Sequence, residues 1–187
     1  MSDSREMHYL IDADDRIVFV SGDWDLFAEE NEASEVKTAK IVNRSLWQFV
    51  TEKTTRAVYT EVLKSVRAGR TAEFTMRCDG PSVRRLLEIS LKPLPAGEVE
   101  FTTRVLATKE RAPQPLLSRS APRSDRKVNM CAWCDRVQVG PDEWREVEDA
   151  AGPLQLGTAA AMPRLSHAVC PHCIAKMAHV IAEMGEA

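Results

Sequence analysis

Hydrophobic and polar residues alternate along three consecutive segments of the chain, 71–78, 84–92 and 99–107. Alternation with a period of two puts apolar side chains on one face of a strand and polar side chains on the other. The apolar positions that share a face are Ala72, Phe74, Met76, Cys78, Leu87, Ile89, Leu91, Val99, Phe101, Thr103 and Val105. Turn-forming residues separate the segments, as at Asp79-Gly80-Pro81. The pattern predicts three antiparallel strands with one buried face.

Two short aliphatic segments, 8–13 and 16–21, stand earlier in the chain on either side of Asp14-Asp15. This arrangement predicts a β-hairpin. Residues 23–31 have the composition of a short helix. The order of elements therefore begins with two strands and continues into helical structure.

A longer helix is predicted over residues 52–68, with Thr51 as its N-cap and Gly69 in the left-handed position that commonly ends a helix. Apolar residues recur along it with helical spacing and define one face. This face consists of Val58, Tyr59, Val62, Leu63 and Val66.

Residues 109–126 interrupt these patterns, because they contain three prolines and several arginines and serines without strand or helix periodicity. Proline removes a backbone donor and favours an extended path, so the segment is predicted to be a linker. It divides the chain into a first unit, residues 1–108, and a second unit, residues 127–187.

The order of strand, strand, helices and three strands in residues 1–108 resembles the PAS domain, a sensory fold. The sequence YLIDADDRIVFVSGDW is similar to its opening hairpin, and LWQFV before the long helix is similar to its helical segment. The resemblance implies an α+β fold in which short helices cover one face of a five-stranded antiparallel sheet. PAS-like domains also pair frequently, so it implies a homodimer.

PAS-like domains often hold a small molecule between sheet and helices, and the inward-facing residues of this unit are predicted to surround that space. They are Phe74, Met76, Ile89, Leu91, Phe101 and Thr103, with Trp24, Phe27, Trp47 and Tyr59 as candidate lids. Apolar walls with one or two polar groups describe a ligand pocket and equally an ordinary packed core. The sequence leaves both readings open, and any PAS ligand unidentified.

Two cofactors are not expected in the first unit. A haem site would need an axial histidine on the helices, and no histidine occurs between His8 and His167. A flavin-adduct photosensor would need a reactive cysteine on a helix, whereas Cys78 falls in a predicted strand. We interpret Cys78 as a buried apolar thiol, with redox sensing as the alternative.

The other four cysteines form two Cys-x-x-Cys pairs, Cys131/Cys134 and Cys170/Cys173, with 35 residues between them. Four soft ligands in this spacing suit a tetrahedral Zn²⁺ ion. Four thiolates leave no open position for water or substrate, so the predicted role of the zinc is structural. His167 is the rival ligand.

The second pair is predicted to open the C-terminal helix, with Pro171 in its first turn. A cysteine knuckle, an intervening segment and a pair at a helix start resemble the treble-clef type of zinc module. CAWC followed by SHAVCPHC is similar to a module of bacterial sensor and response-regulator proteins, although the middle here is longer and rich in alanine. We expect Trp133 to pack over the metal site.

We find no catalytic constellation and expect a non-enzymatic bacterial signalling or regulatory protein. The PAS-like unit would sense a ligand or dimerise, and the zinc module would contact a protein partner. The alternatives are a nucleic-acid-binding transcriptional regulator and a zinc-thiol redox sensor. Lys and Arg number 25 against 28 Asp and Glu, and this net charge of −3 argues against nucleic acid.

The longest apolar runs are short and the first residues are acidic, so we expect no membrane span and no secretory signal. These features predict a cytoplasmic protein.

Overall fold

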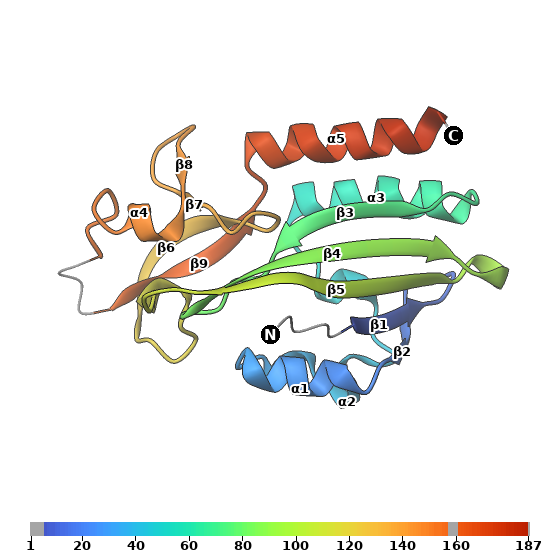
Figure 1. Cartoon of the computed structure of the whole chain (residues 1–187), viewed down its shortest axis with the longest axis horizontal. Helices are drawn as coiled ribbons and strands as arrows, with labels where there is room; N and C mark the ends of the chain where they lie inside the picture. Colours follow the sequence, from blue (N-terminus) through green and yellow to red (C-terminus); the bar gives the residue numbers. More distant parts are fainter. Residues whose placement is uncertain (1–5, 157–160, 187) are drawn as a thin grey trace.

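Two β-sheets lie end to end in the computed structural model of the chain, which describes residues 6–156 and 161–186 (Figure 1). The first is a five-stranded sheet in the order β2-β1-β5-β4-β3, and all its neighbouring strands are antiparallel. Its strands are β1 (Glu6–Ile11), β2 (Ile17–Val20), β3 (Ala72–Arg77), β4 (Val83–Pro93) and β5 (Val99–Glu110). The predicted five-stranded antiparallel sheet is confirmed.

The alternation in the sequence corresponds to the two faces of this sheet. Leu91, Val99 and Phe101 have no solvent exposure, whereas the intervening Arg104 and Glu88 are paired on the outer face. Burying large aliphatic and aromatic side chains contributes about 1.5–3 kcal/mol each, which fixes the register of the strands. Strands β4 and β5 are longer than predicted, and a bulge between Leu86 and Leu87 shifts their pairing.

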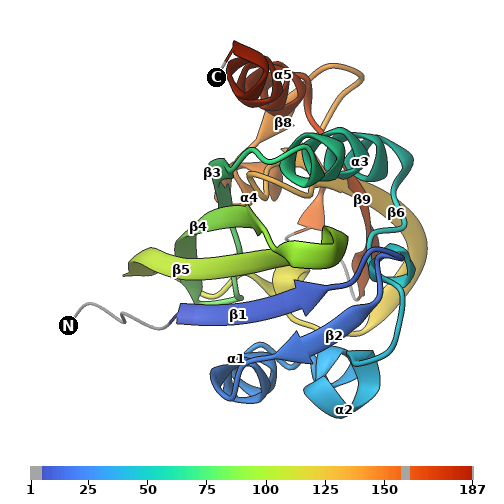
Figure 2. The ribbon, with the colours of Figure 1, turned by 90° about the vertical axis from the view of Figure 1, so that its right-hand side faces the viewer.

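Three helices pack against the apolar side of this sheet (Figure 2). They are α1 (Asp23–Glu30), α2 (Thr38–Ile41) and α3 (Lys53–Arg67). Short 3-10 turns connect the elements at Ser34–Val36, Leu46–Gln48, Pro95–Gly97 and Pro115–Leu117. The α1 and α3 helices and the hairpin β1–β2 are the elements that the sequence predicts.

The cap of α3 differs from the prediction. Glu52, not Thr51, is the N-cap, and its carboxylate accepts hydrogen bonds from the backbone N–H groups of Thr54 (2.9 Å) and Thr55 (2.6 Å). Two of the helix's unpaired donors are thereby satisfied. At the other end, Gly69 has φ +98°, which is the left-handed conformation that its position predicts.

Replacing Glu52 with Ala is expected to lower the free energy of unfolding by about 1 kcal/mol at neutral pH, because two backbone donors lose their acceptor. Partial burial raises the pKa of Glu52, but the hydrogen bonds from Thr54 and Thr55 outweigh this and lower it overall. A carboxyl group whose pKa is lower in the folded than in the unfolded state stabilises the fold at pH values above its unfolded pKa. This stabilisation is lost as the pH falls through the pKa of the folded state. The difference in the free energy of unfolding between variant and parent should therefore become smaller at acidic pH.

Urea unfolding at pH 7 and at pH 3 measures this effect. Glu61→Ala is the matched control, since Glu61 lies exposed on the same helix. Equal stabilities of the two variants at pH 7 would contradict the capping role of Glu52.

The segment 109–126, predicted to be a linker, carries ordered structure. Strand β5 continues to Glu110, and β6 (Arg123–Cys131) begins before the predicted boundary. Leu116 is 2% exposed, and the Arg123 guanidinium donates to the carbonyls of Leu116 and Pro163. The structure thus differs from a free linker because buried and hydrogen-bonded side chains hold the segment in place.

The second sheet has the order β8-β7-β6-β9. Its remaining strands are β7 (Val137–Gln138), β8 (Trp144–Arg145) and β9 (Met162–Ala168), and α4 (Val147–Ala150) follows β8. Strands β6 and β9 are parallel, a pairing that the sequence analysis did not predict. Residues 157–160, in the alanine-rich middle, lie outside the described residues.

Helix α5 (Pro171–Glu186) returns from the second sheet to the first, where it lies beside α3 and strand β3 (Figures 1 and 2). The Lys176 ammonium on α5 donates to the Thr75 hydroxyl of β3 (2.8 Å). Met177 and Met184 of α5 belong to the same hydrophobic cluster as the five-stranded sheet. The two predicted units therefore share one core. In the part of the chain that the structure describes, no helix is both long and apolar enough to cross a lipid bilayer.

Candidate metal centre and adjoining cavity

The four cysteines of the two Cys-x-x-Cys pairs meet in one cluster. The sulfurs of Cys131, Cys134, Cys170 and Cys173 all lie within 4.8 Å of one another. The Cys134 and Cys170 sulfurs are 3.7 Å apart. A tetrahedral ion with metal–sulfur bonds of about 2.3 Å requires sulfurs roughly 3.8 Å apart, so this geometry fits a Zn²⁺ ion.

The first pair stands on a tight turn at the end of β6. The Cys131 N–H donates to the Arg136 carbonyl (2.8 Å), and the Asp135 N–H donates to the Cys131 carbonyl (3.0 Å). Asp135 adopts the left-handed conformation, with φ +56°, that this turn requires. Asx residues tolerate this conformation better than most, which suits Asp135 to its place directly after the pair.

The second pair joins β9 to α5. Pro171 is the first residue of α5, as its place in the sequence predicts, and the Ile174 N–H donates to the Cys170 carbonyl (3.0 Å). The Cys170 N–H points at the Cys131 sulfur (3.4 Å). Backbone donors at a helix start stabilise thiolate charge, which favours metal ligation at this position.

Hydrogen bonds between the sulfurs of Cys131, Cys134 and Cys173 shift the pKa values of these three thiols. The pKa of Cys131 is lowered, because the thiols of Cys134 and Cys173 and the Cys170 N–H donate to its sulfur. The pKa of Cys134 is raised to about 12 and that of Cys173 is also raised, because each donates to Cys131. A cluster that concentrates negative charge on buried sulfur has the chemistry of a site for a soft divalent cation.

The rival ligand His167 lies outside this cluster among the described residues. Its side chain is exposed on β9, opposite Met130 of β6. The set of ligands that fits a metal is therefore the four thiolates, as predicted.

Trp133, between the first two cysteines, lies in the same buried cluster as Cys131, Cys170 and Cys173. It is 3% exposed, and its ring packs against Tyr59 of α3 (5.6 Å between centroids) and Phe74 of β3 (6.4 Å). This aromatic packing holds the metal knuckle, which is the turn of residues 131–135, against the first sheet.

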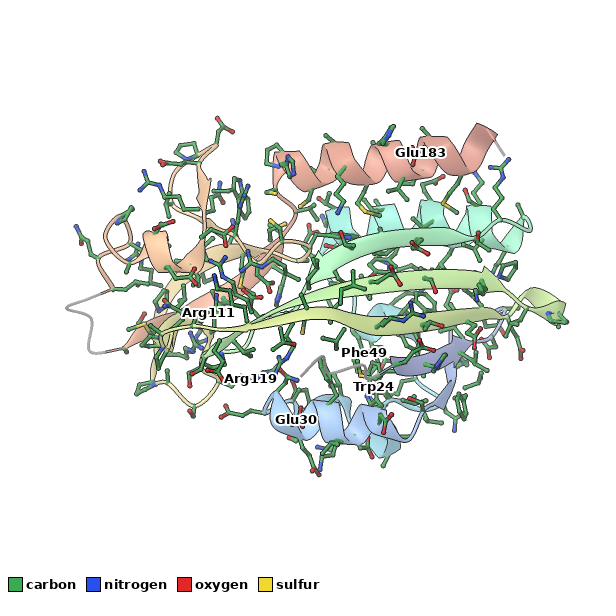
Figure 3. All side chains as sticks on the ribbon, viewed as in Figure 1. Trp24, Glu30, Phe49, Arg111, Arg119 and Glu183 are labelled. Atoms are coloured by element: carbon green, nitrogen blue, oxygen red, sulfur yellow. The ribbon has the colours of Figure 1, made fainter. Side chains whose placement is uncertain are left out.

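A cavity of about 500 Å³ adjoins the knuckle and extends between the first sheet and helix α1. Six of the ten residues predicted for a pocket line it: Trp24, Phe27, Tyr59, Met76, Ile89 and Thr103. Figure 3 shows Trp24 and Phe49 between α1 and the sheet, and both line the cavity. Its volume lies in the range of small-molecule sites.

The other four predicted pocket residues lie elsewhere. Phe74, Leu91 and Phe101 are almost fully buried in the packed core. The Trp47 indole N–H donates to the Asp15 carboxylate (2.7 Å) in the β1–β2 turn, which holds its ring away from the cavity.

Residues from both parts of the chain complete the cavity wall. Sequence reasoning missed Tyr9, although it shares the inward face of β1 with Met7 and Ile11. It also missed a second group, which comes from the segments around the metal cluster. That group consists of Met130, Ala132, Asp135 and His167.

Comparison of the chain with protein-family models and with curated proteins finds no match.

An ion-pair network joins the β3–β4 turn to α4. The Asp79 carboxylate, 1% exposed, pairs with Arg77 and with Arg111, whose own side chain is 6% exposed. The Arg111 guanidinium also bonds Glu148 of α4 (3.1 Å). Although burial raises the pKa of Glu148, the bonds from Arg84 and Arg111 hold it at about 2. The network fastens the second sheet to the first.

Cys78 is expected to resist alkylation in the folded protein. Burial raises the pKa of this thiol to about 11, and only the thiolate is nucleophilic. At pH 8 its reaction with iodoacetamide should be roughly a hundredfold slower than that of an ordinary thiol. Peptide mass spectrometry after timed labelling measures the rate, with the urea-unfolded chain as control. Equal rates in the folded and unfolded chain would contradict this environment for Cys78.

Proposed function

We propose that this chain is a non-enzymatic signalling protein in which a PAS-like sensory unit is joined to a structural zinc module. The observation that carries the proposal is the cavity of about 500 Å³ between an antiparallel sheet and helices, with the four-cysteine cluster beside it. The order of elements in residues 6–110 is the one on which the PAS resemblance rests.

The metal has a structural role in this proposal. The sulfurs of Cys131, Cys170 and Cys173 are buried, and four thiolates complete a tetrahedral shell. When bound, Zn²⁺ would cross-link β6 to the β9–α5 junction. Such a cross-link contributes folding free energy to a region with few buried apolar residues of its own.

The partner in this proposal is a protein, or a second copy of the chain, rather than nucleic acid. Basic residues of segment 109–126 are engaged within the molecule, since Arg111 pairs with acidic side chains and Arg119 pairs with Glu35. The Arg126 guanidinium donates to the Leu154 carbonyl (2.7 Å). Arginines held this way are poorly placed to neutralise phosphates. We propose that the protein acts in the cytoplasm.

Native mass spectrometry of the purified chain tests the proposal. One zinc ion per chain and a dimer or a co-purifying small molecule are the expected results. Denaturing the same sample gives the mass of the bare chain and so the mass of what was bound. A chain without metal whose four cysteines are reduced would overturn the proposed zinc module.

A further inference from the structure

The metal knuckle forms one wall of the cavity. Ala132 lies between the two cysteines of the first pair, and Asp135 follows the pair directly; both line the cavity. Two hydrogen bonds hold this wall against β3 and the turn after it. The Arg77 N–H donates to the Trp133 carbonyl (2.8 Å), and the Asp79 N–H donates to the Asp135 carboxylate (2.8 Å). The shape of the cavity therefore depends on the conformation that the metal ligands hold.

Two tyrosines of the cavity wall have hydroxyls without a protein partner. Tyr9 and Tyr59 both line the cavity, and neither hydroxyl has a hydrogen-bond partner among residues 6–156 and 161–186. Both tyrosine side chains are partly buried. A hydroxyl without a protein partner is free to donate to the oxygen of a bound molecule.

Both hydroxyls are donors over the whole physiological range. Burial raises the pKa of Tyr9 well above its usual value, and the neighbouring Tyr59 raises it further. Burial raises the pKa of Tyr59 to about 12. The ring of Tyr9 stacks on Phe101 (4.4 Å between centroids) and meets the edge of Trp24 (5.7 Å), which fixes its direction.

The cavity wall selects against charge. Apolar side chains from both the sheet and the helices form much of it, among them Met7, Ile17, Ile41, Leu46, Leu87 and Ile89. The two arginines of the lining are already engaged, since Arg77 pairs with Asp79 and Glu146, and Arg119 pairs with Glu35. The free-energy cost of burying an unpaired charge here would be far larger than the stabilisation from one hydrogen bond.

We propose that the cavity binds a small uncharged, mainly apolar molecule whose carbonyl-type oxygen accepts from Tyr9 and Tyr59, and that binding of this molecule and of the metal strengthen each other. The inference rests on the proposed zinc module and extends it. Because the knuckle supplies part of the wall, a metal-free chain holds the cavity in its binding shape for a smaller fraction of the time. By linkage, the ligand must raise metal affinity by the same factor by which the metal raises ligand affinity.

Prodan, an uncharged naphthalene with one ketone, is the probe for the test, and 2-dimethylaminonaphthalene is the same ring system without the ketone. Prodan is expected to bind the zinc-loaded chain at one site per chain, measured by its fluorescence. Tyr9→Phe and Tyr59→Phe should each weaken it about fivefold, the worth of one hydrogen bond. The ketone-free probe should bind parent and variants equally.

Metal removal by a chelator should weaken prodan binding at least fivefold, and saturating prodan should raise the affinity for zinc by the same factor. Ala132→Leu, which narrows the cavity from the knuckle, should reduce prodan binding while zinc content stays at one ion. Phe19→Ser is the matched control, because Phe19 is a 50% exposed apolar residue on the surface. This control should change neither prodan binding nor zinc content.

Equal prodan affinity in both tyrosine variants and the parent would overturn the inference, and so would equal affinity with and without zinc. Zinc content is measured in every sample first. A chain that holds no zinc would contradict the proposed zinc module itself. A zinc-loaded chain with equal prodan affinities in these comparisons would contradict only this inference.

Discussion

Cys173→Ser is expected to abolish tight zinc binding and to lower the free energy of unfolding by more than about 3 kcal/mol. The Cys173 sulfur is buried and is one of four in the cluster, so its loss opens the coordination shell. Structural zinc contributes on the order of 10 kcal/mol in small domains. Zinc content after dialysis against a weak chelator, together with urea unfolding, measures both effects.

The matched control is Cys78→Ser, which makes the same chemical change in a cysteine outside the cluster. This control should keep one zinc ion per chain through the same dialysis. If Cys173→Ser retained zinc as well as Cys78→Ser does, the assignment of the four-thiolate centre would be wrong.

Arg111→Met is expected to lower the free energy of unfolding by about 3 kcal/mol, because it breaks a buried ion-pair network from one side. The Arg111 guanidinium bonds Asp79 (3.1 Å), Glu148 (3.1 Å) and the Gly80 carbonyl (2.8 Å). Methionine keeps much of the aliphatic volume and removes the charge. The lost stability should depend little on salt, because Asp79 is 1% exposed and is weakly screened.

Lys109→Met is the control for this substitution, since Lys109 is an exposed basic residue near the end of β5, just before Arg111 in the chain. Urea unfolding at low and at high salt compares the two variants. A change below about 0.5 kcal/mol for Arg111→Met would show that the network contributes nothing to the junction.

The parts of the fold that follow from local periodicity could be predicted from the sequence. Alternation around Phe101 defines the buried face of β5, and the spacing of Val62, Leu63 and Val66 defines that of α3. The metal cluster was also predictable, because two short Cys-x-x-Cys turns carry their ligand geometry with them wherever the chain brings them together.

The parts that depend on distant partners could not be predicted. Arg111 stands in a proline-containing basic segment and resembles a solvated residue until Asp79 and Glu148, 32 and 37 positions away, are placed beside it. The parallel pairing of β6 with β9 has no local signal either, since β6 is mostly polar and its partner begins 31 positions after β6 ends, at Met162.

The cavity combines both cases. The alternation correctly predicts that Ile89 and Thr103 face inward. It cannot distinguish a residue that lines the cavity from a residue packed in the core such as Leu91, because this difference depends on where the helices lie over the sheet. The contribution of Ala132 and Asp135 to the wall follows only from the contact between the two parts of the chain.

X-ray absorption at the zinc edge of the purified chain tests the central claim most directly, because it reports the ligand atoms themselves. The four-cysteine cluster predicts one zinc ion with four sulfur neighbours at about 2.3 Å and no oxygen or nitrogen neighbour. A shell that contains nitrogen at about 2.0 Å, or an open position filled by water, would contradict the closed thiolate centre and return His167 to consideration as a ligand.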